Sequence, residues 1–483
     1  MESAGFTKLL YYLQDPHHVA RFQKICGVRA TFTSKPAGVT SEAERAPFNK
    51  RTCSGDENRA ANSAGDGQKT DRVPQRRVCR TDTVKRDEFR NGVVNGTASS
   101  LAAGETVNGQ HGANDRHFTG GNERLSENRF NGSGNDTMSR CVQGSAVKPL
   151  RKNSLTGDAG HEFLIESKFL YFLFTFGTEL GNELFYICFF PFLIWNVDPF
   201  VARRLIVVWV WVMYLGQCTK DIIRWPRPAS PPVVKVEMFY NSEYSMPSTH
   251  AMSGTAIPLS LFLLTYGRWE YPLLLGLLLA LGWCVLVCVS RIYMGMHSVL
   301  DVIVGFLYSL LILAAFAPTL DVIDTFNLSC RYAPVLIVSL HAAMGLFSFT
   351  LDTWSTSRGD TAQILGTGAG IAVASHLNYQ LALIPDPPAS ALPLSPPAPT
   401  LGLAGLCLLR FALGVLALLA TRAVMKAITV PLVCWTFSIP SGDVRKARQH
   451  MQVELPYRYI VYWTLGFSAF FLVPLLFGYI GLS

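Results

Sequence analysis

The sequence of 483 residues lacks the cysteine spacing of a metal site and a long apolar run at its start. Among its 11 cysteines, Cys284 and Cys288 lie four residues apart in an apolar segment without a second pair nearby, so we interpret them as small core residues. We therefore expect no disulfide framework, no metal site and no cofactor. The first 13 residues contain Glu2 and Lys8 but no apolar core of a signal peptide, so the membrane segments themselves are expected to direct targeting.

Charged residues are rare in the C-terminal two thirds of the chain and common before it. Residues 1–168 hold 25 Lys and Arg against 19 Asp and Glu, which accounts for six of the eight net positive charges. The cations are scattered among acids, and this favours a solvated tail over a surface for nucleic acid or anionic lipid. We expect no nucleic-acid partner. Leu, Val, Phe, Ile, Ala and Trp dominate the rest, which predicts a membrane-embedded part.

The composition divides the chain into four regions. Residues 1–26 mix apolar and polar side chains and are predicted to form a short amphipathic segment, lying against the membrane or against the domain itself. Residues 27–165, rich in Gly, Asn, Ser and Arg, are predicted to be a disordered polar tail. Residues 166–320 contain three polar motifs, and 321–483 are predicted to form further transmembrane helices.

Apolar stretches of about 20 residues, the length that crosses a bilayer core, recur through the C-terminal part. The chain is therefore predicted to be an all-α membrane protein, a multi-pass helical bundle of about nine transmembrane helices. Seven prolines make 385–399 a linker, and Pro431 and Pro440 interrupt 425–440, which we interpret as a re-entrant or interfacial piece. The predicted spans are 169–197, 203–219, 250–267, 271–290, 298–317, 332–350, 361–382, 400–421 and 458–481.

The first motif follows the second span. Lys220 and Arg227 are seven residues apart, and Pro226 and Pro228 are expected to end the helix there. Two cations at a membrane boundary suit a phosphate dianion, for which Arg offers a planar fork. Taken alone, the pair is better explained as an ordinary basic flank of a membrane helix.

The second motif opens the third span. Pro247, Ser248, Thr249 and His250 bring backbone N–H groups and two hydroxyls to a helix N-terminus, which is a ready anion site. His250 beside them is a candidate general acid. Taken alone, the pattern is better explained as a simple N-cap followed by an interfacial histidine.

The third motif joins the fourth and fifth spans. His297 and Asp301 are spaced i,i+4, so in one helical turn their side chains share a face. A carboxylate beside an imidazole fixes its tautomer and supports nucleophilic attack by the other ring nitrogen. Arg291 supplies a further cation. Charge at membrane depth is expensive, so three such clusters in order indicate a functional site rather than coincidence.

The combination resembles the type 2 phosphatidic acid phosphatase superfamily, with its motifs K-x6-RP, PS-x-H and SR-x5-H-x3-D. Thr249 stands where the commonest form of the second motif has Gly, and the surrounding YSMPSTHAMSGT and SRIYMGMHSVLDV resemble the sphingosine-1-phosphate phosphatase branch. The long N-terminal tail favours its type 1 form. The matching positions are Lys220, Arg227 and Pro228; Pro247, Ser248 and His250; and Ser290, Arg291, His297 and Asp301.

The resemblance implies a metal-independent lipid phosphatase of the endoplasmic reticulum membrane acting on sphingosine 1-phosphate. It implies His297 as nucleophile, Asp301 as its orienting partner, and His250 as the acid that protonates the leaving alkoxide and then activates water. The phosphoryl oxygens would be held by Lys220, Arg227, Ser248, Thr249 and Arg291. Cations and a helix N-terminus would then supply the charge that metal ions supply in many phosphatases.

Substrate and class remain open at this level. The motifs specify only the phosphoryl end, so dolichyl pyrophosphate, phosphatidate or glucose 6-phosphate are alternative substrates. Glu179 and Glu183, spaced i,i+4, could face the amine of a sphingoid base, or pair with polar groups inside the bundle. A transporter or a non-catalytic lipid-binding protein is the alternative class. The oligomeric state is not predicted.

The side of the membrane also remains open. With two spans before the first motif's loop, the N-terminal tail, the motifs and the basic loop 422–456 share one face, which the positive-inside rule places in the cytosol. The resemblance instead implies a lumenal site. Possible glycosylation sequons that would report topology begin at Asn95, Asn131, Asn135 and Asn327.

Overall fold

The computed structural model describes residues 2–31, 145–153, 156–352 and 357–482, and these are mostly helical. Most of the predicted polar tail lies outside these residues. The helices are α1 (Glu2–Gln14), α2 (Pro16–Ile25), α3 (Lys168–Glu179), α4 (Glu183–Asn196), α5 (Pro199–Ile223), α6 (Thr249–Thr265), α7 (Leu273–Tyr293), α8 (Val299–Phe316), α9 (Leu320–Ser329), α10 (Ala333–Leu351), α11 (Arg358–Gln380), α12 (Leu401–Thr436), α13 (Val444–Ala447), α14 (Met451–Phe467) and α15 (Val473–Tyr479).

Six helical segments in the described part of the chain are long and apolar enough to cross a membrane: α5, α7, α8, α10, α12 and the continuous stretch through α14 and α15. Their outer leucines, such as Leu274 and Leu278 on α7, are exposed, as side chains that face lipid are. The multi-pass helical architecture is therefore confirmed. The predicted spans at α6 and α11 are helical too but are not among these six, so nine crossings stay a prediction.

The predicted single span 169–197 is wrong in one respect, because it is two helices. α3 ends at Glu179 and α4 begins at Glu183, with Asn182 as its N-cap residue. Gly181 lies in the break, where an added Cβ would be 3.1 Å from His250 Cδ2. The break therefore lets the backbone approach the second motif closely.

Of the two alternatives for 425–440, the re-entrant one is also wrong, and the interfacial one stays a prediction. α12 runs without interruption from Leu401 to Thr436 and includes Pro431. Proline removes one backbone donor from a helix, and neighbouring turns keep the remaining hydrogen bonds. Residues 385–399 are irregular apart from one short turn, Ala389–Ala391, as the prolines predict.

A three-stranded antiparallel sheet lies at the two ends of the region predicted as a polar tail. Its order is β1 (Val28–Ala30), β3 (Phe163–Ile165) and β2 (Ser145–Val147). Short strands this close to a polar region carry little periodic signal, so the sequence did not predict them. Phe163 and Ile165 are buried against Tyr293, Met294 and Met296, at the third motif.

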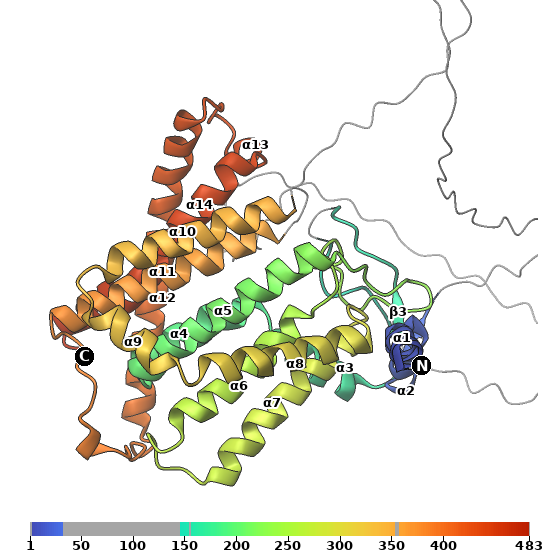
Figure 1. The fold of residues 1–483 in the computed structure, drawn as a ribbon, viewed down its shortest axis with the longest axis horizontal. Helices are drawn as coiled ribbons and strands as arrows, with labels where there is room; N and C mark the ends of the chain where they lie inside the picture. Colours follow the sequence, from blue (N-terminus) through green and yellow to red (C-terminus); the bar gives the residue numbers. More distant parts are fainter. Residues whose placement is uncertain (1, 32–144, 154–155, 353–356, 483) are drawn as a thin grey trace, which may run out of the picture. The chain divides into compact units, whose positions relative to one another are not determined.

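α5 lies at the centre of the bundle, where it packs against α4, α6 and α11, as Figure 1 shows. One apolar core is formed by α4, α5, α11 and the α14–α15 stretch, and a second by α5, α6 and α8. All four charged residues of α5 lie near its two ends: Arg203 and Arg204 near the start, and Lys220 and Asp221 in the last turn. With about 1.5 Å of rise per residue, Arg203 and Lys220 lie roughly 25 Å apart along the axis.

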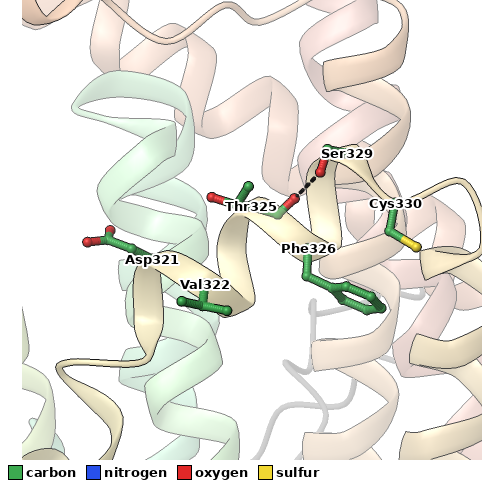
Figure 2. Close-up of a pocket in the computed structure, with 6 residues that line it drawn as sticks. All are labelled: Asp321, Val322, Thr325, Phe326, Ser329 and Cys330. Atoms are coloured by element: carbon green, nitrogen blue, oxygen red, sulfur yellow. Dashed lines mark hydrogen bonds between the residues drawn. The ribbon is translucent and has the colours of Figure 1, made fainter.

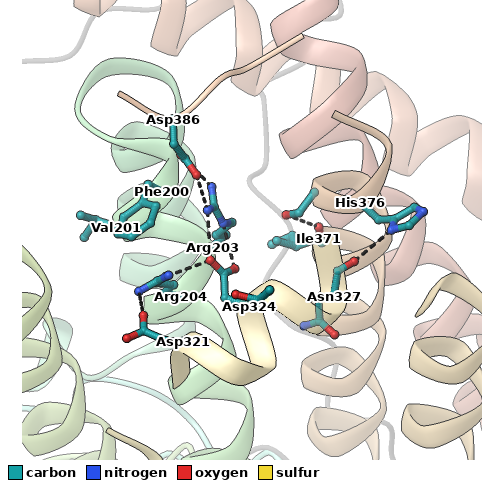
Figure 3. A network of polar contacts seen from close by, with 12 residues as sticks. Phe200, Val201, Arg203, Arg204, Asp321, Asp324, Asn327, Ile371, His376 and Asp386 are labelled. Carbon is teal, nitrogen blue, oxygen red and sulfur yellow. Dashed lines mark hydrogen bonds and ion pairs between the residues drawn. The ribbon is translucent and has the colours of Figure 1, made fainter. Parts of the chain in front are cut away.

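The N-terminal end of α5 carries a paired charge network (Figure 3). Arg203 donates to Asp324 of α9 at 2.9 and 3.0 Å and to Asp386 at 3.0 and 2.6 Å. Arg204 shares Asp324 at 2.9 Å and also reaches Asp321. These bonds attach α9 and the proline-rich connection to α5.

A shallow pocket of about 420 Å³ lies along one side of α9 (Figure 2). Its walls mix apolar and polar side chains of α9 and of its C-cap residue Cys330, and Ser329 Oγ donates to the carbonyl of Thr325 one turn earlier. None of the sequence motifs contributes to this pocket. The lining residues are Asp321, Val322, Thr325, Phe326, Ser329 and Cys330.

Candidate active site

The three motifs meet at the C-terminal end of α5. This helix ends at Ile223, as Pro226 and Pro228 predict, and Arg224 caps it in the left-handed conformation. The second motif begins α6 and the third begins α8, each with a serine N-cap. The bond from Ser248 N to Asp301 O, 3.2 Å, joins these two helix starts directly.

Lys220 of the first motif contacts the second motif. Its Nζ donates to Thr249 Oγ1 at 3.1 Å and to Glu243 Oε2 at 3.1 Å, and its side chain is almost fully buried. Ser248 Oγ, also buried, accepts from Ala251 N as the α6 cap. A buried ammonium is therefore fixed beside a helix N-terminus, an arrangement that favours anions.

Arg227 contacts the third motif. Its Nη1 donates to Met296 O at 2.8 Å and lies 3.2 Å from His297 Nε2, while Nε donates to Glu243 O at 2.9 Å. Because a guanidinium only donates, Nε2 is the unprotonated nitrogen of His297 in this arrangement. A lone pair on His297 therefore points toward a cation.

A serine lies between His297 and Asp301. Ser245 Oγ donates to Asp301 Oδ2 at 2.6 Å and lies 3.3 Å from His297 Nδ1, whereas Nδ1 and Oδ2 are 3.9 Å apart. The expectation that both residues occupy one helical turn is wrong, since His297 precedes the N-cap Ser298. Asp301 Oδ2 also accepts from Ser298 N at 2.7 Å, in a capping box. The imidazole is therefore oriented through Ser245.

The neighbours of His250 differ from those of His297. Its Nε2 is 2.9 Å from Asn182 Oδ1, in the break between α3 and α4, and the ring of Tyr240 lies 5.0 Å away, edge-on. Within the part of the chain that the structure describes, its side chain forms no hydrogen bond with the other two motifs. A break in the first membrane segment thus positions the second motif's histidine.

Arg291 is fully buried, and only part of its guanidinium group is hydrogen-bonded. Its Nη1 donates to Glu237 Oε2 at 3.1 Å, and Glu237 is also 3.7 Å from Arg151. Within the described residues, Arg291 Nε and Nη2 have no hydrogen-bond partner. These two atoms form one edge of the guanidinium fork, the edge that binds two oxygens of a phosphate or carboxylate. An unsatisfied buried donor pair is costly without a ligand.

The cations set the electrostatics of the site. Burial lowers the pKa of His297 well below its ordinary range, and the charges of Arg227, Arg291, Lys220 and His250 lower it further. Burial also lowers the pKa of Arg227 to about 10 and that of Lys235 to about 7. His297 is thus neutral over a wide pH range. No group of three His, Cys, Asp or Glu side chains in the described ranges could hold a metal ion.

Four neighbours of the motifs were not predicted from the sequence: Glu243, Ser245, Glu237 and Asn182. The two glutamates carried a usable signal, because acids in a short loop between cationic motifs need partners. Ser245 and Asn182 carried none, since their roles depend on how distant helices pack.

The two glutamates considered for an amine headgroup differ. Glu179 is neutralised by Arg151, which donates to it at 2.8 and 3.0 Å. Glu183 accepts from Tyr462 OH at 3.3 Å, and it forms no ion pair with any Lys or Arg among the residues described. It directly follows Asn182, the residue that contacts His250, and its own carboxylate is directed toward Tyr462 of α14.

Comparisons with known proteins agree with this arrangement. A family model described as the PAP2 superfamily matches residues 201–322, which contain all three motifs. The chain is 52% identical over 471 residues to sphingosine-1-phosphate phosphatase 1 of Rattus norvegicus, covering 98% of this chain and 97% of that protein. It is 39% identical over 324 residues to sphingosine-1-phosphate phosphatase 2 of Homo sapiens, covering 66% and 80%.

The same 52% identity over 471 residues relates the chain to sphingosine-1-phosphate phosphatase 1 of Mus musculus, so the predicted resemblance to the type 1 form is confirmed. No solved structure matches the chain at a significant level. Near-complete coverage of both chains leaves no large region outside the similarity. The chain therefore belongs to the sphingosine-1-phosphate phosphatase family, within the PAP2 superfamily.

Proposed function

We propose that this membrane protein is a metal-independent phosphatase that hydrolyses sphingosine 1-phosphate, and its dihydro and phyto forms, to the sphingoid base and inorganic phosphate. Its relatives at 52% identity carry the name of that activity. By removing the phosphate, the reaction would control sphingolipid signalling and supply the base for ceramide synthesis.

The free edge of Arg291 is the observation that carries the proposal. Its Nε and Nη2 are buried and without a hydrogen-bond partner in the described part of the chain, at a site that also holds Lys220 and Arg227. A tetrahedral dianion satisfies such donors with two oxygens at once. Three buried cations and the N-terminus of α6 would hold the phosphoryl group and stabilise the charge that develops on it.

In the first step, His297 Nε2 attacks phosphorus and the bond from phosphorus to the lipid oxygen breaks. Nδ1–H donates a hydrogen bond to Ser245 Oγ, and the Ser245 hydroxyl donates a hydrogen bond to Asp301 Oδ2. Asp301 stays ionised, so its negative charge supports the imidazolium that forms. The leaving alkoxide takes a proton from His250 and departs as the sphingoid-base alcohol.

In the second step, His250, now unprotonated, removes a proton from water. The resulting hydroxide attacks the phosphohistidine, the N–P bond breaks, and phosphate leaves with His297 restored. Asn182 would keep the His250 ring in position, because its Oδ1 lies 2.9 Å from His250 Nε2. Ser248 and Thr249 would hold phosphoryl oxygens, with Lys220 already 3.1 Å from Thr249 Oγ1.

We also propose the endoplasmic reticulum membrane as the location. Asn327 on α9 offers a test of sidedness, because α9 is attached to the end of α5 away from the motifs. Glycosylation at Asn327 in cells would place the active site in the cytosol. An acceptor sequon engineered into the 437–450 connection, if glycosylated instead, would place the site in the lumen.

The test is phosphate release by the purified protein in detergent with excess EDTA. The substrates are sphingosine 1-phosphate, dihydrosphingosine 1-phosphate, ceramide 1-phosphate, phosphatidate and glucose 6-phosphate. We expect selective, EDTA-resistant hydrolysis of the sphingoid-base phosphates. Preference for another substrate would keep the chemistry and reject the substrate, and binding without any turnover would favour a non-catalytic lipid-binding or transport protein.

A further inference from the structure

The loop that carries the nucleophile is held by its carbonyl groups. Between the end of α7 and the start of α8, four successive carbonyls, those of residues 293–296, each accept a hydrogen bond from outside the loop. The donors are Gln23 Nε2 to Tyr293 O at 2.9 Å, Val236 N to Met294 O at 3.1 Å, Lys235 Nζ to Gly295 O at 2.8 Å and Arg227 Nη1 to Met296 O at 2.8 Å.

Three of these donors belong to the connection between α5 and α6, which also carries Arg227 of the first motif. The fourth, Gln23, belongs to α2 and is separated by more than 200 residues from its partners. Gln23 is 1% exposed although it lies on a short helix of mixed polarity. A buried amide of this kind requires partners for all of its polar atoms.

Gln23 also binds the connection itself. Its Nε2 donates to Val234 O at 2.7 Å, and its Oε1 accepts from Val234 N at 3.0 Å. One side chain therefore joins the backbone of the α5–α6 connection to the backbone of the nucleophile loop. Arg227 and His297 lie on those two segments, so Gln23 links the backbone that carries Arg227 to the backbone that carries His297.

The packing beside Gln23 is specific to glycine. Gly295 has a φ of +70°, and an added Cβ would lie 2.3 Å from Val234 O and 3.0 Å from Gln23 Nε2. The loop can thus approach the connection and the Gln23 amide only because residue 295 has no side chain. Phe22 and Cys26 of the same segment pack on the apolar core beneath Tyr293 and Met294.

We propose that the N-terminal segment is a working part of the active site, with Gln23 as the positioning residue that sets the nucleophile loop against the first motif. The segment was expected to lie on the membrane or on the domain, and α2 lies on the domain at the third motif. The kinetic test of this role rests on the proposed function, because it measures hydrolysis of sphingosine 1-phosphate. Hydrogen exchange of the loop provides a second readout that does not depend on any substrate.

The test compares two variants of Gln23 in the purified full-length protein. Gln23→Ala removes all three hydrogen bonds, and Gln23→Glu keeps the size and the acceptor but removes both bonds to carbonyls. Gln380→Ala is the matched control, because Gln380 Nε2 donates to a single carbonyl, that of Leu328, at the end of the bundle away from the motifs. Lys24→Ala, an exposed neighbour on α2, controls for changes in the helix itself.

We expect both Gln23 variants to lower kcat for sphingosine 1-phosphate about tenfold or more, with KM within about twofold, because a small misplacement of reacting groups has large kinetic effects. Amide exchange in residues 293–297 should become about tenfold faster, and neither control should change either quantity. Unchanged kcat and exchange in the Gln23 variants would overturn the proposal, as would an equal effect in Gln380→Ala.

Two other outcomes are also decisive. If Gln23→Ala does not fold, Gln23→Glu decides, and failure of both to fold would reject positioning in favour of a role in folding alone. If the unmodified protein hydrolyses none of the lipids, the proposed substrate fails, while the exchange rate of the loop still supports or rejects the contact made by Gln23.

Discussion

The two ends of α5 use the same residue types in opposite ways. At the N-terminal end, Arg203 binds Asp324 through two donors, Arg204 shares the same carboxylate, and Arg268 pairs with Asp198 at 2.6 and 3.1 Å. All three guanidinium groups also stack on the ring of Phe200. Arginine at this end is fully engaged.

At the C-terminal end, the cations are buried to a similar degree and less well satisfied. Arg291 keeps two donors without a partner, and Asp301 Oδ1, also buried, has none in the described residues. Burial without full pairing is unfavourable, so it persists where function requires it. The comparison separates a structural charge cluster from a ligand site, which composition alone does not do.

The largest expected effect on activity comes from comparing one histidine at each end of α5. His297→Ala should lower phosphate release on the order of 10⁴-fold or more, because the nucleophile is lost. His376→Ala removes a histidine that contacts Asn327 O at 3.0 Å in the α9 region (Figure 3), and activity should stay within about twofold. The measurement is phosphate release by the two full-length variants from one lipid substrate. Equal losses of activity would contradict the assignment of His297 as the nucleophile.

The next effect compares two buried arginines. Arg291→Lys should lower kcat/KM about 100-fold, since an ammonium is a point charge and does not provide a two-donor edge. Arg268→Lys should lower the thermal midpoint instead and leave kcat/KM nearly unchanged, because its partner is Asp198. Steady-state kinetics with differential scanning would separate these outcomes. A loss of kcat/KM in the Arg268 variant would break the distinction.

At the paired end, Asp324→Asn should lower the free energy of unfolding by about 3 kcal/mol. The change leaves two buried arginine side chains short of the carboxylate that they share. The activity per folded molecule should be retained. Denaturant-induced unfolding in detergent, beside the activity of the surviving fraction, checks this, and retention of full stability would mean that the network contributes little.

The pH dependence should move when a cation next to His297 is removed. The pKa of His297 is lowered by burial first and then by Arg227, so the acid limb of kcat/KM should lie below the ordinary histidine value of about 6.5. Arg227→Gln removes a positive charge that disfavours the imidazolium, so the limb should rise by about one pH unit. If the acid limb of the Arg227→Gln variant stays at the same pH while its rate falls, the limb reports the titration of a group other than His297.

The smallest effect concerns selectivity. Glu183 forms no close ion pair among the described residues, although Arg458 and Arg422 act on it from a distance, whereas Glu179 is paired with Arg151. If Glu183 faces the amine of a sphingoid base, Glu183→Gln should reduce the preference for sphingosine 1-phosphate over phosphatidate up to about tenfold. Glu179→Gln should not. Competition assays with the two lipids measure the ratio, and no change in either variant would reject the amine contact.

Local signals in the sequence predicted much of the fold. Apolar length located the helices through α5 to α8, and the prolines after Arg224 located the end of α5. The break at Gly181 and the continuous α12 were not predicted, because each depends on packing. At Gly181 the absence of a side chain allows the backbone to pass close to His250, and α12 continues through Pro431.

The sequence by itself determined the membrane-embedded class, the family and the motif residues that gather at one end of α5. Residue type and spacing suffice for these, because bilayer thickness and phosphate chemistry allow few alternatives. Only the tertiary structure decided that Ser245 stands between His297 and Asp301, that Arg291 keeps a free edge, and that Gln23 holds the nucleophile loop. Hydrogen bonds between residues far apart in the chain depend on the packed fold, and no local pattern encodes them.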